Sequence, residues 1–110
     1  VADGVGGADA GEFASEYATS QTIATYLENS DQEHYGQRLV KAMQTANTNL
    51  RTLVAERYNG KRMATTMVAA VITDGRAYIA NVGDSRGYHW RDNELRQITK
   101  DQSLVAKLFE

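Results

Sequence analysis

The segment from Thr65 to Val82 constrains the fold more than any other part of this sequence. Thr65 to Thr73 and Arg76 to Val82 are both rich in valine, isoleucine, threonine and alanine, as β-strands often are. Asp74-Gly75 separates the two runs and is a strong signal for a two-residue hairpin turn. The sequence therefore predicts an antiparallel hairpin in this segment.

Closing that turn predicts which residues face each other across the hairpin. The register gives three pairs: Ile72 opposite Ala77, Val71 opposite Tyr78, and Ala70 opposite Ile79. Both faces of the ribbon are then largely apolar, whereas a sheet with one solvated face would alternate with polar residues. We therefore expect helices to cover one face and a second sheet to cover the other.

Two helices are predicted before the hairpin, over Asp9 to Asn29 and from about Gln32 to Tyr58, where Asn59-Gly60 ends the second. Apolar residues at helical spacing predict the buried stripe of each helix. In the first helix the stripe is Phe13, Tyr17, Ala24 and Leu27, and in the second it is Leu39, Met43, Ala46, Leu50 and Leu53.

A more polar hairpin is predicted after the first one. Its strands are Gly87 to Arg91 and Glu94 to Thr99, and they turn at Asp92-Asn93 so that Trp90 faces Leu95. A last helix is expected over Leu104 to Phe109, capped by Asp101 or Ser103. Helices and antiparallel strands that are segregated along the chain predict the α+β class, and this order makes a plausible half of a layered sandwich.

Length and charge exclude several classes of protein. The chain has 110 residues, enough for one domain, and its net charge of −2 gives no basic surface for nucleic acid. No apolar run approaches the roughly 20 residues that cross a bilayer. The absence of cysteine fits a reducing compartment, and we expect a cytoplasmic protein. Because Val1 directly precedes the first motif and Glu110 ends inside the predicted helix, we expect a central fragment of a longer domain.

The chain opens with Asp3-Gly4-Val5-Gly6-Gly7, which places a carboxylate beside bare backbone. A carboxylate and accessible carbonyl oxygens are hard ligands that suit Mg²⁺ or Mn²⁺. Glycine-rich turns at a helix start can instead cradle phosphate, although this one lacks the third glycine of a dinucleotide fingerprint and the lysine of a P-loop. From these residues alone, a simple tight turn is the third interpretation.

A second motif, Gly83-Asp84-Ser85-Arg86, follows the strand Arg76 to Val82. One interpretation is a turn that is stabilised by an Asp–Arg pair. The other is a carboxylate near a metal or a phosphate, held in place by its neighbours.

Together the two motifs carry a resemblance that covers nearly the whole chain in the right order. The chain resembles the metal-dependent protein phosphatases of type 2C, in their bacterial form. The resemblance rests on VADGVGG, followed by two helices, then TTMVAAVITDGRAYIANVGDSRGYHW and LRQITKDQSLV. The resemblance implies a four-layer α-β-β-α sandwich, of which residues 1–110 would be the central part. It also implies hydrolysis of phosphoserine and phosphothreonine with two or three Mn²⁺ or Mg²⁺ ions and a metal-activated water.

The resemblance assigns roles to residues of this chain. Asp3 would bridge two metal ions and is the expected catalytic residue, and the Gly4 carbonyl would ligate one of them. Asp84 would bind a third, weaker ion, while Arg86 would fix the local loop. Val5 stands where some eukaryotic members carry a histidine acid. The expected partners are phosphorylated proteins, opposite a serine/threonine kinase.

The chain departs from the family pattern at two positions, and some of the pattern lies outside it. Ala64 and Gln102 stand where the family usually has glycine and histidine. The family's phosphate-binding arginine, an acidic residue and two further aspartates fall before Val1 or after Glu110. We therefore expect the 110 residues alone to be inactive and to self-associate through unpaired sheet edges. The alternative is a degenerate phosphatase fold that binds phosphoprotein without hydrolysis.

Overall fold

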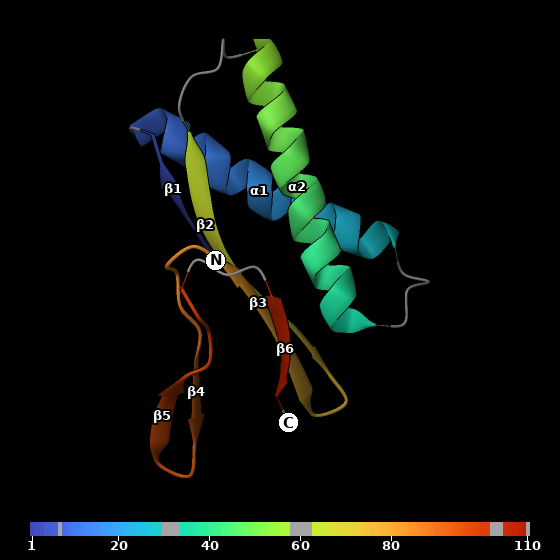
Figure 1. The fold of residues 1–110 in the computed structure, drawn as a ribbon, viewed down its shortest axis with the longest axis vertical. Coiled ribbons are helices and arrows are strands. Elements are labelled where there is room, and N and C mark those ends of the chain that lie inside the picture. Colours follow the sequence, from blue (N-terminus) through green and yellow to red (C-terminus); the bar gives the residue numbers. More distant parts are fainter. Residues whose placement is uncertain (7, 30–33, 58–62, 102–104, 110) are drawn as a thin grey trace.

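The computed structural model describes residues 1–6, 8–29, 34–57, 63–101 and 105–109 (Figure 1). Within these residues the chain forms two helices and six strands. In order they are β1 (Ala2–Val5), α1 (Ala8–Glu28), α2 (Tyr35–Arg57), β2 (Ala64–Thr73), β3 (Arg76–Val82), β4 (Tyr88–Arg91), β5 (Glu94–Gln97) and β6 (Val105–Phe109). Neither described helix has the length and apolar character needed to cross a membrane.

The strands form two antiparallel sheets. The larger has the order β1-β2-β3-β6, and the smaller pairs β4 with β5. The register confirms the predicted pairs: Ile72 faces Ala77, Val71 faces Tyr78, Ala70 faces Ile79, and Trp90 faces Leu95. Asp74 and Gly75 have φ of 51° and 74°, and Asp92 and Asn93 have φ of 53° and 60°. Two positive φ values at each turn match the hairpin geometry that the sequence predicts.

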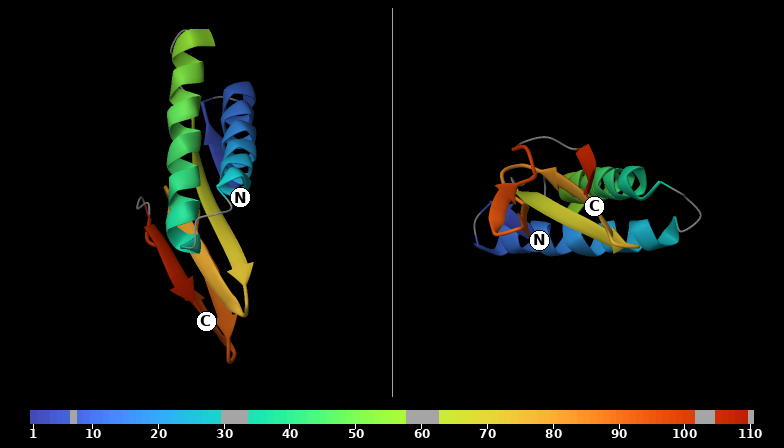
Figure 2. Two further views of the ribbon diagram at one scale, coloured as in Figure 1. Left: turned by 90° about the vertical axis from the view of Figure 1, so that its right-hand side faces the viewer. Right: turned by 90° about the horizontal axis from the view of Figure 1, so that it is seen from below.

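Both helices lie on one face of the larger sheet (Figure 2). The core between them contains Met67 from β2 and Ala80 from β3, packed against side chains of both helices. Within β2, Ala69 and Val71 also contact this core, so the odd-numbered residues of β2 face the helices. The even-numbered residues of β2 consequently point to the opposite face, which we call the outer face.

The buried stripe of α2 agrees with the prediction, and that of α1 does not. Leu39, Met43, Ala46 and Leu50 are buried as expected, while Leu53 is half-buried. In α1 the predicted stripe is wrong, because Ala24 is exposed and Leu27 is 65% exposed. Small residues four apart are buried instead: Ala10, Ala14, Ala18 and Thr22. The reason is the close approach of α1 to the sheet, which leaves room for small side chains only.

Gly4 and Gly11 mark the point of closest approach between β1 and α1. A Cβ atom placed on Gly4 would lie 1.8 Å from the Gly11 carbonyl oxygen, and one on Gly11 would lie 2.9 Å from the Gly4 carbonyl carbon. Real Cβ atoms do not approach backbone this closely, so glycine is required at both positions. The packing of β1 on α1 is therefore a contact between two backbones.

A buried arginine ties α2 to the end of α1. Arg38 is 8% exposed, and its Nε donates a hydrogen bond of 2.7 Å to the Tyr26 carbonyl in the last turn of α1. Its guanidinium lies over the Tyr26 ring, 3.8 Å from the ring centroid. The last carbonyl groups of a helix have no partner within the helix and carry partial negative charge, so a cation is well placed there.

In this chain the outer face is covered only in part. Ile72 and Val5 on this face are 78% and 63% exposed. The β4–β5 hairpin projects away from the two helices (Figure 1), and only the chain at its base, at Gly87, approaches Val68 and Ile79. The expected helix layer is therefore present on one face, while the second sheet formed by the described residues leaves most of the other face open.

The last element is a strand, so the prediction of a helix over Leu104 to Phe109 is wrong for the described residues of that segment. Val105–Phe109 forms β6 and pairs with β3, from Asn81 opposite Val105 to Ala77 opposite Phe109. A helix of six residues has little intrinsic stability. The free edge of β3 offers backbone donors and acceptors, and pairing with β6 satisfies them.

Candidate metal centre

Asp3 lies on β1, directly opposite Thr66 of β2. Asp3 and Thr66 have the same side-chain orientation across the ladder, and Thr66 is an even-numbered residue of β2, so both point to the outer face. The Asp3 carboxylate is exposed. Ala2 and Gly4, its neighbours, face the helices. The strand therefore places one carboxylate on the side of the sheet that the helices leave open.

The Gly4 carbonyl points away from β2. Val1 and Val68 exchange two backbone hydrogen bonds of 2.8 Å, which makes them a hydrogen-bonded pair. Hydrogen-bonded and non-hydrogen-bonded pairs alternate along an antiparallel ladder. Asp3 and Thr66 therefore form the next hydrogen-bonded pair, and Gly4 and Thr65 form a non-hydrogen-bonded pair. The Gly4 carbonyl therefore points away from β2, toward the edge of the sheet where no strand of the described chain pairs with β1. A carbonyl free of the ladder is what the predicted ligand role of Gly4 requires.

The second motif follows β3 and returns to the same end of the sheet. Gly83 has φ of 88°, and a Cβ atom there would lie 2.6 Å from Cγ2 of Thr66. Thr66 Oγ1 and Ser85 Oγ share a hydrogen bond. Asp84 lies between these two contacts and is exposed. Thr66 thus faces Asp3 on one side and holds the loop of Asp84 on the other.

Arg86 is engaged within the protein, as the family resemblance implies, and its carboxylate partner is Asp101 rather than an aspartate of its own motif. Its Nε and Nη2 donate hydrogen bonds of 3.1 and 2.9 Å to the two carboxylate oxygens of Asp101. This bidentate pair raises the pKa of Arg86 above its ordinary value and lowers the pKa of Asp101. Nearby, the buried Asn81 side chain donates to the Lys100 carbonyl at 2.8 Å. The two contacts attach the segment after β5, at Lys100 and Asp101, to the end of β3 and the loop that follows it.

The donors at this end of the sheet suit a hard divalent cation. They are the carboxylates of Asp3 and Asp84 and the Gly4 carbonyl, all oxygen ligands. A carboxylate pointing outward would repel a phosphate, so it fits a cation better than the phosphate-cradling interpretation of the first motif. Among the described residues no three acidic, histidine or cysteine side chains converge on one point. Asp3, Gly4 and Asp84 are therefore candidate ligands only, and the described residues do not by themselves assemble a complete ligand set.

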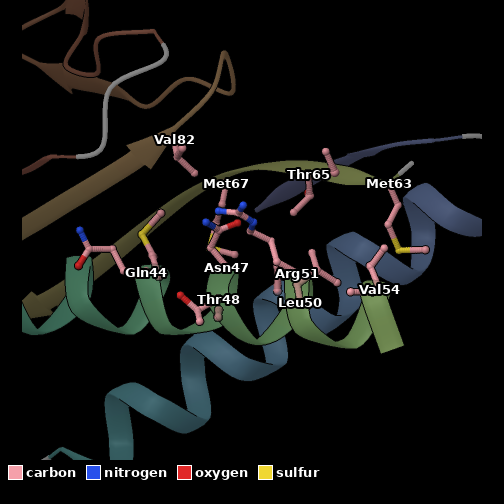
Figure 3. A pocket seen from close by; sticks show the side chains of 15 residues that line it. Gln44, Asn47, Thr48, Leu50, Arg51, Val54, Met63, Thr65, Met67 and Val82 are labelled. Atoms are coloured by element: carbon pink, nitrogen blue, oxygen red, sulfur yellow. The ribbon is translucent and has the colours of Figure 1, made fainter. Parts of the chain in front are cut away.

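A groove on the helix side of the sheet lies apart from these donors. It has a volume of about 670 Å³ and runs between α2 and β2 (Figure 3). Met67, Val82 and Leu50 line it, together with Arg51 and Asn47 of α2. Because Met67 faces the helices and Asp3 faces the opposite side, the groove does not belong to the candidate metal centre.

Comparison with known proteins agrees with the two motifs. The sequence profile of protein phosphatase 2C matches residues 1–106. The chain belongs to the protein phosphatase 2C family. It is 40% identical over 112 residues to the serine/threonine phosphatase stp of Listeria welshimeri, covering 99% of this chain and 44% of that protein. It is 37% identical over 113 residues to PstP of Mycobacterium tuberculosis, covering 100% of this chain and 21% of that protein.

The fold of this phosphatase 2C chain agrees with solved structures of the family. The catalytic domain of the serine/threonine phosphatase PstP, in complex with two manganese ions, superposes with a TM-score of 0.78 at 35% identity. The superposition covers 91% of this chain and 43% of that one. The predicted α+β fold of the type 2C phosphatases is thereby confirmed. The chain spans less than half the length of these relatives.

Four positions of this phosphatase 2C chain show what the sequence did and did not reveal. Ala64, where the family usually has glycine, is exposed opposite Val5, so its methyl group causes no crowding. Gln102, the other departure, lies outside the described residues. The link between Thr66 and Ser85 was not predicted, although the strand register together with the Gly83–Arg86 motif could have shown that the two hydroxyls meet.

Proposed function

We propose that the whole protein containing this chain is a metal-dependent serine/threonine protein phosphatase, and that Asp3, Gly4 and Asp84 are metal ligands. The observation that carries this proposal is that Asp3 and Gly4, whose carbonyl is free of the ladder, are adjacent in β1 at the edge of the sheet. The relatives named as serine/threonine phosphatases, and the PstP structure with two manganese ions, support the choice of reaction and ion.

Each residue of the chain has a distinct task in this proposal. Asp3 would hold the two main ions through its carboxylate, and Gly4 would contribute its carbonyl to one of them. Asp84 would hold a third ion more weakly, because it is exposed on a loop. When bound, such ions lower the pKa of water toward neutrality and neutralise phosphate charge. Val5 is aliphatic and exposed beside Asp3, so it cannot supply the proton for the leaving oxygen.

We further propose that residues 1–110 alone do not catalyse the reaction. Two divalent cations require several negatively charged or carbonyl ligands, and the described residues bring no three acidic, histidine or cysteine groups together. Additional ligands would come from the rest of the whole protein. The proposed reaction implies that phosphorylated proteins are the substrates. Three further expectations stay predictions: an opposing kinase, self-association through unpaired sheet edges, and a cytoplasmic location.

Turnover of a phosphothreonine peptide by the whole protein tests the proposed function. With Mn²⁺ we expect release of phosphate, and Asp3→Asn should reduce kcat at least a thousandfold while the fold remains intact. Asp9→Asn is the matched control, because Asp9 is an exposed carboxylate in the first turn of α1 and should leave turnover unchanged. A whole protein that binds the phosphopeptide without turnover would favour the non-catalytic module instead.

A further inference from the structure

The loop that carries Asp84 continues from β3 and contacts β2 at Thr66. Gly83 and Ser85, the residues on either side of Asp84, both contact Thr66. Thr66 in turn is the third residue of β2, opposite Asp3 on β1 and next to Met67, which pairs with Val82 at the end of β3. Thr66 therefore links the strand position of Asp3 with the loop of Asp84.

The two branches of Thr66 make different contacts. Its methyl group lies against Gly83, where a Cβ atom would come within 2.6 Å, so the loop passes close over this methyl. Its hydroxyl shares a hydrogen bond with the hydroxyl of Ser85. Because the χ1 angle of threonine is restricted by its branching, one rotamer satisfies both contacts. Thr66 and Ser85 are both half-buried, so their bond is only partly exposed to water.

We propose that Thr66 and Ser85 form a positioning pair that fixes the Asp84 loop relative to Asp3 and thereby sets the affinity of the metal ion bound by Asp84. The proposal rests on the proposed function for the role of Asp84. Neither hydroxyl needs to touch the ion or the substrate. Residues that orient a metal ligand typically change metal affinity by about 10- to 100-fold when they are removed.

Four variants of the whole protein separate the hydroxyl from the methyl contact. Thr66→Val keeps a methyl group against Gly83 and removes the hydroxyl, and Ser85→Ala removes the partner hydroxyl. Thr66→Ser keeps the hydroxyl and is the rescue variant. Thr65→Val is the matched control, because the Thr65 hydroxyl bonds only locally, to the Thr66 carbonyl at 2.8 Å.

Two measurements apply to these variants. Amide hydrogen exchange of residues 83–86 in metal-free protein reports how firmly the loop is held, independently of catalysis. Manganese titration, followed by the paramagnetic resonance signal of free Mn²⁺, reports the affinity of the weakest site. We expect Thr66→Val and Ser85→Ala each to raise exchange and to weaken that site about tenfold. Their combination should do no more than either alone, because both remove the same bond.

The expected pattern also requires Thr66→Ser to resemble the wild type and Thr65→Val to change nothing. Unchanged exchange and unchanged manganese affinity in Thr66→Val and Ser85→Ala would overturn the proposal, and so would fully additive effects. Failure of the proposed function has a different signature. In that case the wild-type protein would show no manganese-dependent turnover, whereas the hydrogen-exchange results would still decide whether the hydroxyl pair holds the loop.

Discussion

The two faces of the β1-β2-β3 sheet differ in what they contribute to this molecule. The helix face is closely packed, with Met67 4% exposed, Ala80 fully buried, and the backbones of Gly4 and Gly11 in contact. The outer face carries Asp3 and Thr66, and it leaves Ile72 78% exposed. Because side chains alternate along a strand, neighbouring residues of β1 and β2 lie on opposite faces, so the buried residues and the candidate ligand Asp3 belong to the same strands.

This difference explains how a short strand can tolerate a charged residue. β1 has only four residues, Ala2–Val5, and its stability comes from Ala2 and Gly4 against the helices rather than from Asp3. Changes on the helix face should therefore unfold the protein, while changes on the outer face should spare the fold. Three experiments on the stability of this chain test that contrast.

The largest effect is expected where β1 meets α1. Gly4→Ala places a methyl group where only 1.8 Å separates it from the Gly11 carbonyl oxygen, so strand and helix must move apart. We expect the free energy of unfolding to fall by at least about 3 kcal/mol, as measured by urea denaturation. Gly75→Asn is the control, because Gly75 has a positive φ of 74° with open space around it. Equal losses in the two variants would contradict the close packing of β1 on α1.

An intermediate effect should distinguish the two faces of β2. Met67→Ala removes a buried core side chain and should cost about 2 to 4 kcal/mol. Ile72→Ala on the outer face should change the stability of this chain by less than about 0.5 kcal/mol. Both substitutions keep strand β2 and its register, so thermal unfolding followed by circular dichroism compares them directly. A larger loss for Ile72→Ala than for Met67→Ala would reverse the assignment of the faces.

The smallest effect concerns the Arg86–Asp101 pair on the solvent side. Arg86 holds the pKa of Asp101 below its ordinary value, so the pair stabilises the fold at neutral pH and loses this contribution as pH falls through the lowered pKa. Asp101→Asn should therefore lower the urea midpoint slightly at pH 7 and leave it unchanged at about pH 2, below the ordinary carboxyl range. Arg86→Gln should give the same pH dependence. A loss for Asp101→Asn that is equal at both pH values would show that the charge pair is not its cause.

The sequence predicts those parts of the fold where local chemistry and tertiary packing agree. The Asp74-Gly75 turn sets the register of β2 and β3, and the apolar stripe of α2 identifies its buried face. The same reasoning fails for α1, because large apolar residues such as Leu27 do not identify the buried face when the sheet is close enough to admit only small side chains. The strand β6 was missed because its formation depends on a free edge of β3.

For the candidate site, the sequence predicts the candidate ligands but not all of the packing around them. Asp3, Gly4 and Asp84 were proposed from the two motifs and the family resemblance, and the structure places their motifs at one end of the sheet. The reason for glycine at position 4 was only half predicted. Its carbonyl is free of the ladder, but the contact with Gly11 depends on the path of α1 and has no local signal in the sequence.

The central claim is that Asp3 and the Gly4 carbonyl face the ions of a metal centre completed by the whole protein. A crystal structure of the whole protein grown with Mn²⁺, with the ions located by anomalous scattering, tests it most directly. We predict a carboxylate oxygen of Asp3 and the carbonyl oxygen of Gly4 within about 2.0 to 2.3 Å of manganese. An Asp3 carboxylate turned away from every manganese ion would contradict the account.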